Sequence, residues 1–284
     1  HDARSAKGVR MNRFDGKTVI LTGASSGIGE SCARKFVAEG ARAVLAARSQ
    51  GPLQELAAEL GADVAVALPT DVSKLGDCER LIQAAKSRFG SVDVVVNNAG
   101  HNSRGPLEDL SIDDMLQMVD VNLRAPMMLT RLALPILREQ GSGSVVIVAS
   151  LAGRLPLDDE ATYSATKVGL RFFSFAVAEE LRGTDIRVCV VSPGPVDTGF
   201  IMDPKVIDTV PAVIFAQPMS TPDEIAELVL ASAADGKRER TKPAFNGKLL
   251  TLSYLMPGLR RLLTPAFEKK GERVKQKYLA RASK

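Results

Sequence analysis

The chain has 284 residues, of which 45% are hydrophobic and 25% charged; this is close to the globular average and excludes disordered and fibrous classes. The formal net charge is only +4, and aromatic residues make up 5% of the chain with no Trp, a composition unlike that of proteins that stack nucleic-acid bases. Three well-separated cysteines, Cys32, Cys78 and Cys189, and two histidines exclude a disulfide framework, give no grounds for a metal site and indicate a reducing, cytoplasmic setting.

The chain begins with polar residues that show no periodic pattern, and Met11 would serve as a natural start. These residues lack the apolar core of a secretory signal peptide. We expect residues 1–12 to be a disordered arm or an expression remnant. The patterns that follow predict a single domain over residues 13–248 and a basic amphipathic extension over residues 249–284.

Short β-branched runs alternate with longer helical patterns along this domain. Strands are predicted at residues 17–22, 43–47, 64–68, 92–97, 144–149 and 186–191. Helices are predicted between them at residues 28–39, 53–60, 74–89, 111–140 and 161–182. Near-continuous apolar strands separated by helices predict an α/β fold with a doubly wound, Rossmann-like parallel sheet. Ligands of such sheets lie beyond the carboxyl ends of the strands, so candidate site residues are sought there.

A glycine-rich turn joins the first predicted strand to the first predicted helix. Glycines at this point let the backbone turn tightly and approach a pyrophosphate, whose charge meets the helix N-terminus. An isolated glycine motif is equally well explained as a plain tight turn, but the order of strand, turn and helix favours a binding loop. The turn reads Thr22-Gly23-Ala24-Ser25-Ser26-Gly27-Ile28-Gly29.

With the motifs that follow it, this TGxxxGxG spacing resembles the short-chain dehydrogenase/reductase family, from about residue 16 to about residue 234. The resemblance implies an enzyme that moves a hydride between a nicotinamide cofactor and an alcohol or carbonyl group. It rests on several motifs in register, which are the glycine turn, Asp71-Val72, Asn97-Asn98-Ala99-Gly100, Asn122, Ser150, Tyr163 with Lys167, and Pro193-Gly194.

Tyr163 and Lys167 are four residues apart, so on a helix they lie on one face. A neighbouring ammonium is expected to lower the pKa of the phenol from about 10 toward the working range. An ordinary amphipathic helix explains an isolated pair of this kind, but Ser150 at the end of a predicted strand favours a catalytic site. The resemblance implies that Tyr163 exchanges a proton with the substrate oxygen and that Ser150 hydrogen-bonds that oxygen. It also implies that Lys167 holds the nicotinamide ribose and that Asn122 positions a water molecule.

The resemblance also implies how the dinucleotide is held. Asp71 would bind the adenine amino group and Val72 would line the ring. Pro193 and Gly194 would lie near the nicotinamide, and Thr198 would reach its carboxamide. The remaining cofactor contacts are expected from the glycine turn (Gly23, Ser25, Ser26, Gly27, Ile28, Gly29), from Asn98, Ala99 and Gly100, and from Val196.

The end of the second predicted strand distinguishes NADP(H) from NAD(H). Proteins that bind NAD place an acidic residue there, whereas a 2′-phosphate requires positive charge. Ala47 stands where the acid is expected and Arg48 follows it; a guanidinium binds phosphate in a bidentate manner. Ser49 and Ser25 would add hydroxyl groups. We therefore predict NADP(H) rather than NAD(H), the alternative being that Arg48 is a solvated residue that opens the next helix.

The substrate is expected to lie between residues 154–160 and the largely apolar stretch 199–220, which predicts a lipophilic alcohol or carbonyl compound. An apolar stretch that only covers the domain is the alternative. His101 is expected to be an exposed loop residue. The methionines of the long helix, Met115, Met118, Met127 and Met128, are assigned to the core or to a subunit interface, and the family resemblance implies a homodimer or homotetramer.

The charge of the chain is unevenly distributed. Residues 236–284 hold 14 Lys and Arg against 3 Asp and Glu, a net charge of +11, while residues 1–235 carry −7. No apolar run reaches the roughly 20 residues of a membrane span. An apolar piece at residues 249–263 precedes a basic run at residues 269–284, which predicts either a helix packed on its own domain or a peripheral membrane contact. A nucleic-acid partner is not expected, because no reading motif accompanies these charges.

These observations favour an NADP(H)-dependent oxidoreductase that acts on a secondary alcohol or ketone. A 3-oxoacyl-thioester reductase of fatty-acid metabolism would use the same site and is the enzymatic alternative. A non-catalytic nucleotide-binding regulator is the alternative from another class. The complete set of Asn122, Ser150, Tyr163 and Lys167 argues against the regulator, because a binding module does not need all four.

Overall fold

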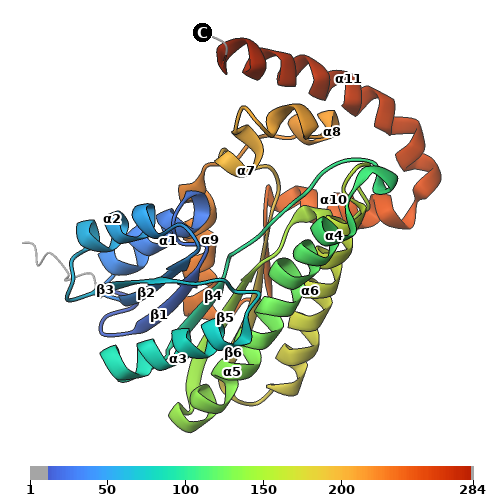
Figure 1. Cartoon of the computed structure of the whole chain (residues 1–284). Coiled ribbons are helices and arrows are strands. Elements are labelled where there is room, and N and C mark those ends of the chain that lie inside the picture. Colours follow the sequence, from blue (N-terminus) through green and yellow to red (C-terminus); the bar gives the residue numbers. More distant parts are fainter. Residues whose placement is uncertain (1–11, 283–284) are drawn as a thin grey trace, which may run out of the picture.

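The structure is a computed structural model that describes residues 12–282, apart from the side chains of residues 245–249, 253, 257, 259, 260, 263, 281 and 282. The arm expected at residues 1–12 lies outside the described residues except for its last position. Within the described part, seven parallel strands form one sheet in the order β3-β2-β1-β4-β5-β6-β7 (Figure 1). They are β1 (Thr18–Thr22), β2 (Arg42–Ala47), β3 (Ala65–Pro69), β4 (Val94–Asn97), β5 (Ser142–Val148), β6 (Asp185–Pro193) and β7 (Glu239–Lys242).

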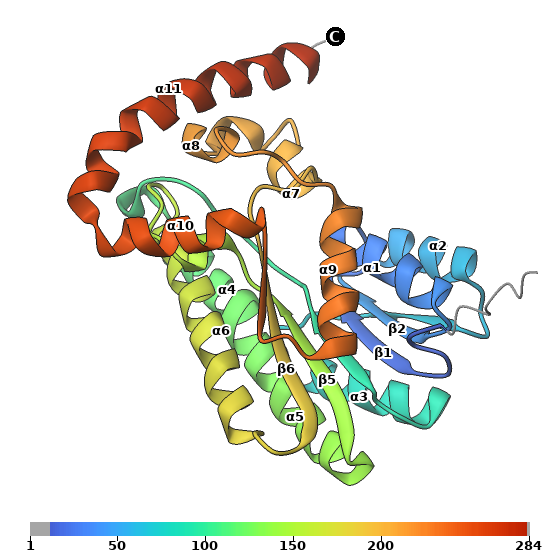
Figure 2. The same cartoon turned by 180° about the vertical axis from the view of Figure 1, so that it is seen from behind.

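Helices cover both faces of this sheet, which confirms the predicted doubly wound α/β fold. One face packs against α1 (Gly27–Ala38), α2 (Gln50–Leu60) and α9 (Pro222–Asp235). The other packs against α3 (Leu75–Phe89), α5 (Ala125–Gln140) and α6 (Ala161–Glu180) (Figures 1 and 2). Because side chains alternate along a strand and both faces are buried, the strands read as continuous apolar runs.

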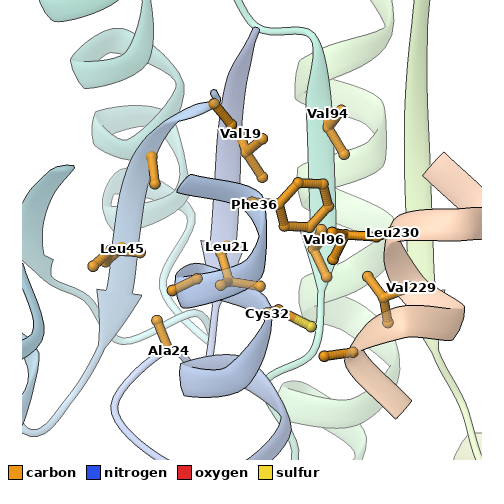
Figure 3. Close-up of a cluster of buried hydrophobic side chains, with 14 of the residues drawn as sticks. Val19, Leu21, Ala24, Cys32, Phe36, Leu45, Val94, Val96, Val229 and Leu230 are labelled. Atoms are coloured by element: carbon orange, nitrogen blue, oxygen red, sulfur yellow. The ribbon is translucent and has the colours of Figure 1, made fainter. Parts of the chain in front are cut away.

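The core on the α1 side shows this packing directly. Phe36 and Cys32 of α1 are fully buried against strand residues such as Val96 of β4 (Figure 3). Val229 of α9 closes the cluster from the other side. Ile20 of β1 points instead into the core beneath α3 and α5. The three cysteines are free and buried.

Two parts of the backbone differ from the sequence-based expectation. The single helix expected at residues 111–140 is divided into α4 (Ile112–Val119), a π-helical turn η2 (Asp120–Arg124) and α5. Strand β7 was not expected, because charged residues dominate its short sequence. The Glu239 carboxylate of β7 accepts hydrogen bonds from Arg171 and Ser192, so its charge is compensated inside the fold.

The segments that close the upper end of the molecule come from the C-terminal third of the chain. They are α7 (Gly199–Met202), a 3₁₀ turn η4 (Ile207–Thr209) and α8 (Ala212–Phe215), followed after β7 by α10 (Ala244–Leu255) and α11 (Pro257–Ala282). Helix α11 crosses over α8 in both views (Figures 1 and 2). None of the helices in the described residues is both apolar and long enough to span a bilayer.

Candidate active site

A cavity of about 490 Å³ lies at the carboxyl ends of the strands. It lies where the chain leaves β1 toward one edge of the sheet and β4 toward the other, which is where doubly wound sheets bind ligands. Most of the predicted site residues line it, namely Gly23, Ser25, Ser26, Gly27, Ile28, Arg48, Ser49, Asp71, Val72, Asn98, Ala99, Gly100, Ser150, Tyr163, Lys167, Pro193, Gly194, Val196 and Thr198. The predicted residues Gly29 and Asn122 are not part of the cavity wall.

The glycine turn is shaped by close backbone contacts. Gly23 has a φ of +66°, and a Cβ there would lie 2.9 Å from the Asn98 Nδ2 atom. A Cβ at Gly29 would lie 2.0 Å from the carbonyl oxygen of Gly23, so the absence of a side chain at Gly29 allows α1 to start against the turn. Gly27 opens α1 at the cavity wall, where the helix N-terminus favours a phosphate group.

The turn is tied to the end of β4 by Thr22, whose role the sequence motif did not reveal. The Thr22 hydroxyl donates to the carbonyl oxygen of Val96 at 3.2 Å and accepts from the backbone N–H groups of Asn98 and Ala99. The Asn98 amide donates in turn to the carbonyl oxygens of Thr22 and Gly23. Asn98 therefore supports the glycine turn from behind.

The far end of the cavity carries the residues predicted to select the cofactor. Arg48 and Ser49 are exposed at the cavity wall directly after Ala47, which is buried. The Asp71 carboxylate accepts a hydrogen bond from the Ser73 hydroxyl at 2.7 Å, and this bond holds the pKa of Asp71 below its usual value. The residue at the end of β2 is thus not acidic, and a guanidinium follows it at the cavity wall.

Tyr163, Ser150 and Lys167 lie together at the opposite end of the cavity. Ser150 lies beside the Tyr163 hydroxyl and acts to lower the pKa of that phenol. Ser150 follows β5 and opens the 3₁₀ turn η3 (Leu151–Gly153). The Lys167 Nζ atom lies 5.5 Å from the centre of the Tyr163 ring and donates to the carbonyl oxygen of Val148 at 3.3 Å. Both the tyrosine and the lysine side chains are buried.

Burial governs the ionisation of this pair. It raises the pKa of Tyr163, and the Glu160 carboxylate raises it further, while Ser150 and Arg104 act in the opposite direction. The pKa of Tyr163 therefore lies above its ordinary value rather than below it, because the loss of water around the phenol outweighs the groups that lower it. Burial also lowers the pKa of Lys167 to about 8.

Asn122 acts on the backbone rather than on the cavity surface. It is fully buried in η2, where its Oδ1 atom accepts from the His101 N–H and its Nδ2 atom donates to the His101 carbonyl oxygen, both at 2.7 Å. Asn122 also donates to the Thr166 hydroxyl of α6. It thus connects the loop after β4 to the helix that carries Tyr163. His101 itself is half-buried rather than exposed as expected.

An ion pair that sequence analysis missed closes the cavity beside Tyr163. Arg104 Nε donates to Glu160 Oε1 at 2.8 Å, and each side chain is only 2% exposed. The same guanidinium donates to the carbonyl oxygen of Phe200 and lies over its ring at 5.3 Å. No motif marks this pair, since the two residues are 56 positions apart.

The two stretches expected to bound the substrate both reach the cavity. Leu157 and Glu160 contribute from the first, and Phe200, Ile201, Ile214 and Gln217 from the second. The other apolar residues of the second stretch include Ile207, Val210 and Phe215, which pack with Val274, Tyr278 and Leu279 of α11. For these residues the structure therefore favours the packing alternative. Met118 is buried against Tyr163, whereas Met127 is 38% exposed on α5.

The sequence was compared with known protein families and proteins. The sequence pattern described as short chain dehydrogenase matches residues 17–205. Ketoacyl reductase HetN of Nostoc sp. is 37% identical over 246 residues, which cover 86% of this chain and 83% of the relative. An uncharacterized oxidoreductase of Staphylococcus aureus strain MRSA252 is 34% identical over 227 residues, covering 80% of this chain and 95% of the relative.

Proposed function

The chain belongs to the short-chain dehydrogenase family, and on this premise we propose that it uses NADP(H) to interconvert a lipophilic ketone and a secondary alcohol. Its relatives are oxidoreductases, and the family acts on alcohol and carbonyl groups with nicotinamide dinucleotides. The observation that carries the proposal is the buried contact between Tyr163 and Ser150, with Lys167 beside it, at the end of a cavity lined by the glycine turn.

Tyr163 supplies the proton in the direction of reduction. Its raised pKa keeps the phenol protonated at neutral pH, so that it can donate to a carbonyl oxygen as negative charge develops there. The Ser150 hydroxyl hydrogen-bonds the same oxygen and orients it. When bound, the nicotinamide supplies the hydride, or accepts it in the reverse direction. Lys167 holds the nicotinamide ribose, and its pKa of about 8 lets it pass a proton onward near neutrality.

Asn122 would keep this arrangement in place and position a water molecule toward Lys167. Its amide already fixes the loop after β4 against α6 through His101 and Thr166. The glycine turn would hold the pyrophosphate, with Asp71 and Val72 at the adenine.

The NADP(H) preference rests on Arg48. Its guanidinium stands at the cavity wall where proteins that bind NAD carry an acid. Ser49 and Ser25, which also line the cavity, would add hydrogen bonds to a 2′-phosphate. Pro193, Gly194, Val196 and Thr198 would contact the nicotinamide end.

The proposed substrate is lipophilic because the substrate end of the cavity is lined by Leu157, Phe200, Ile201 and Ile214. A 3-oxoacyl thioester is the second candidate, and the name of the Nostoc relative, a ketoacyl reductase, favours it. An acyl chain would occupy the same apolar walls, so the two candidates differ in the group attached to the reacting ketone.

We also propose that the enzyme is a homodimer or homotetramer, as is usual in its family. An apolar stripe on α4, α5 and α6 would supply the contact between copies. Large side chains that are at least 37% exposed lie along it, namely Ile112, Leu116, Val119, Met127, Val168 and Phe172.

Two measurements test the proposed function. Thermal unfolding is followed with NADP⁺ and, separately, with NAD⁺, because a ligand at a hundredfold excess over its Kd stabilises the folded state by about 2.7 kcal/mol. NADPH consumption is then measured with lipophilic ketones and with 3-oxoacyl thioesters. We expect stabilisation by NADP⁺ and turnover of one of the two substrate classes.

The matched control is Tyr163→Phe, which keeps the ring and removes the proton donor. We expect it to lose at least about 10²-fold in kcat while its stabilisation by NADP⁺ persists. Near-normal turnover by this variant would contradict the mechanism. Stabilisation by NADP⁺ without turnover by the unmodified chain would instead favour the non-catalytic regulator.

A further inference from the structure

The turn between α10 and α11 carries an unusual concentration of exposed apolar side chains. The part of the chain that the structure describes has fifteen large apolar side chains that are exposed, and six of them lie between positions 252 and 267. Every side chain described between positions 252 and 270, except that of Thr264, is exposed. The six are Leu252, Tyr254, Leu255, Met256, Leu262 and Phe267, with exposed fractions from 44% to 76%.

Positive charge surrounds this apolar set. No Asp or Glu occurs between Glu239 and Glu268. Arg261, Lys269, Lys270 and Arg273 are exposed beside the apolar residues, and they outnumber the two exposed carboxylates of this part, Glu268 and Glu272. We call residues 252–273 the basic corner. It stands at the edge of the molecule in both views, away from the sheet (Figures 1 and 2).

We propose that the basic corner is a docking surface for an anionic lipid bilayer. Leucine, methionine and aromatic side chains enter the boundary between headgroups and acyl chains, and each cation near an anionic surface adds attraction. A protein partner with a matching apolar groove would satisfy the apolar residues equally well. Residues 252–273 hold five Arg and Lys against two Glu, and no carboxylate occurs over the 28 positions 240–267. This excess of positive charge favours a uniformly negative surface over a mixed-charge protein surface.

The corner is fastened to the cavity at its α10 end. The Gly194 N–H, at the cavity wall, donates to the carbonyl oxygen of Lys242, the last residue of β7, at 2.7 Å. Only Pro243 separates Lys242 from α10. Arg154 Nη1 donates to the Thr251 hydroxyl of α10 at 2.8 Å. The start of the corner is therefore held at a fixed position near the proposed substrate end.

The corner is fastened again at its α11 end. Lys275 Nζ donates to the carbonyl oxygens of Asp208 and Val210, and it is only 9% exposed. The ring centres of Tyr278 and of Phe215 on α8 are 6.0 Å apart. Ile214, next to Phe215 in the chain, lines the cavity. A bilayer held at the corner would thus be connected through α11 to the elements that form the substrate walls. For a lipophilic substrate, which rests on the proposed function, the bilayer would also be the source of substrate.

Co-sedimentation with vesicles tests the proposal without any requirement for activity. The full chain is mixed with vesicles of phosphatidylcholine, and with vesicles of phosphatidylcholine and phosphatidylglycerol in equal parts. We expect binding to the anionic vesicles that falls steeply when the ionic strength rises from about 0.1 M to about 1 M, because the Debye length shrinks from about 10 Å to about 3 Å. Absence of binding to anionic vesicles at low salt would overturn the proposal.

Two double variants separate the apolar and the charged contributions. Lys269→Glu with Lys270→Glu should weaken binding to anionic vesicles by at least about tenfold. Leu255→Ser with Leu262→Ser should weaken it by a similar factor at both salt concentrations. The matched control is Arg80→Glu with Lys86→Glu on α3, at 57% and 48% exposure of the side chains, which should bind as the unmodified chain does.

The competing occupant is a second copy of this chain. If the leucine variant lowers the molecular mass in solution and leaves vesicle binding unchanged, the corner is a contact between copies and the proposal is wrong. If the control variant loses as much vesicle affinity as the lysine variant, the attraction belongs to overall charge, and the proposal is wrong in that case too. A circular dichroism spectrum of each variant establishes that it is folded.

Discussion

Arg104 and Glu160 form a buried ion pair that joins three elements around Tyr163. Arg104 lies in the loop after β4, Glu160 directly precedes α6, and the Arg104 guanidinium also binds the Phe200 carbonyl oxygen of α7. The Phe200 ring lies 6.1 Å from that of Tyr163. The Asn102 amide donates to the same Glu160 oxygen at 3.1 Å. The pair therefore fixes the apolar segment Gly199–Met202 beside the Tyr163 ring, and both of its members act on the pKa of Tyr163.

Glu160→Gln is expected to lower the pKa of Tyr163. The change removes the carboxylate that raises this pKa but keeps an oxygen for Arg104 and Asn102. Since alcohol oxidation needs the deprotonated phenol, its rate should rise at lower pH than in the unmodified enzyme. The pH profile of kcat for oxidation measures this.

Asp159→Asn is the matched control. Asp159 is exposed, contributes nothing to the pKa of Tyr163 and has a φ of +59° that asparagine tolerates. Its pH profile should be unchanged. An alkaline displacement of the Glu160→Gln profile would contradict the electrostatic role assigned to Glu160. Glu160→Gln removes the charge that faces Arg104 but keeps a hydrogen-bond acceptor. We therefore expect it to lower the free energy of unfolding by less than the roughly 3–5 kcal/mol of a fully broken buried pair.

The sheet and part of the site around Tyr163 could be predicted from the sequence, but other parts could not. The sheet was predictable because its strands are buried on both faces, and Ser150 and Tyr163 were predictable because a motif places them at a strand end and on the next helix. The Arg104–Glu160 pair was not, since neither residue has a periodic neighbour and only the folded chain brings them together. Strand β7 was missed for a related reason: the charge of Glu239 is compensated by Arg154 and Arg171, which a local pattern cannot show.

The packing of the C-terminal helix α11 could not be predicted from the sequence either. Its apolar and basic composition is readable, but composition does not state which surface a helix covers. Gly271 decides this in the structure, because its lack of a side chain lets α11 approach the backbone of α8 at Ala212.

Arg48→Ala is expected to weaken NADP⁺ binding by about 10- to 100-fold, the equivalent of one or two charge-assisted hydrogen bonds. NAD⁺ lacks the 2′-phosphate, so Arg48→Ala should change the Kd of NAD⁺ by no more than about twofold. Calorimetric titration of both dinucleotides measures the two effects. Arg80→Ala, which removes a cation bound to Asp77 outside the cavity, should change neither. Equal weakening of both dinucleotides by Arg48→Ala would contradict the proposed phosphate contact.

Gly271→Ala is expected to separate α11 from α8. A Cβ at Gly271 would lie 1.8 Å from the carbonyl oxygen of Ala212, so the two helices must move apart, at a cost of about 1–3 kcal/mol in the free energy of unfolding. Because α8 carries Ile214 at the cavity wall, KM for the carbonyl substrate should rise while the Kd of NADPH stays unchanged.

Gly258→Ala provides the comparison within the same helix. No atom lies within 4 Å of a Cβ at Gly258, and alanine favours a helix over glycine by about 0.5–1 kcal/mol. This variant should be as stable as the unmodified chain or slightly more so. Chemical denaturation of both variants tests the contrast, and equal stability of the two would show that α11 does not need its close approach to α8.

Lys167→Met is expected to stabilise the protein at neutral pH while abolishing its activity. The folded pKa of Lys167 is about 8, against an ordinary value of 10.5. Between these values the unfolded chain binds more protons, so the contribution of Lys167 to stability rises with pH over that interval and is least favourable below pH 8. At pH 7 the buried ammonium thus costs about 3 kcal/mol, of which the hydrogen bond to Val148 offsets about 1 kcal/mol in the comparison with methionine.

The variant should therefore exceed the unmodified chain by about 2 kcal/mol at pH 7, and this advantage should disappear as the pH approaches 10.5. Urea denaturation at several pH values measures the difference directly. Lys86→Met, at an exposed position of α3, should give a small difference that does not depend on pH in this range. If Lys167→Met instead has a lower free energy of unfolding than the unmodified chain, and the difference is the same at every pH, then compensating contacts hold the ammonium. In that case Lys167 would not be a group whose burial reduces stability in exchange for proton transfer near neutrality.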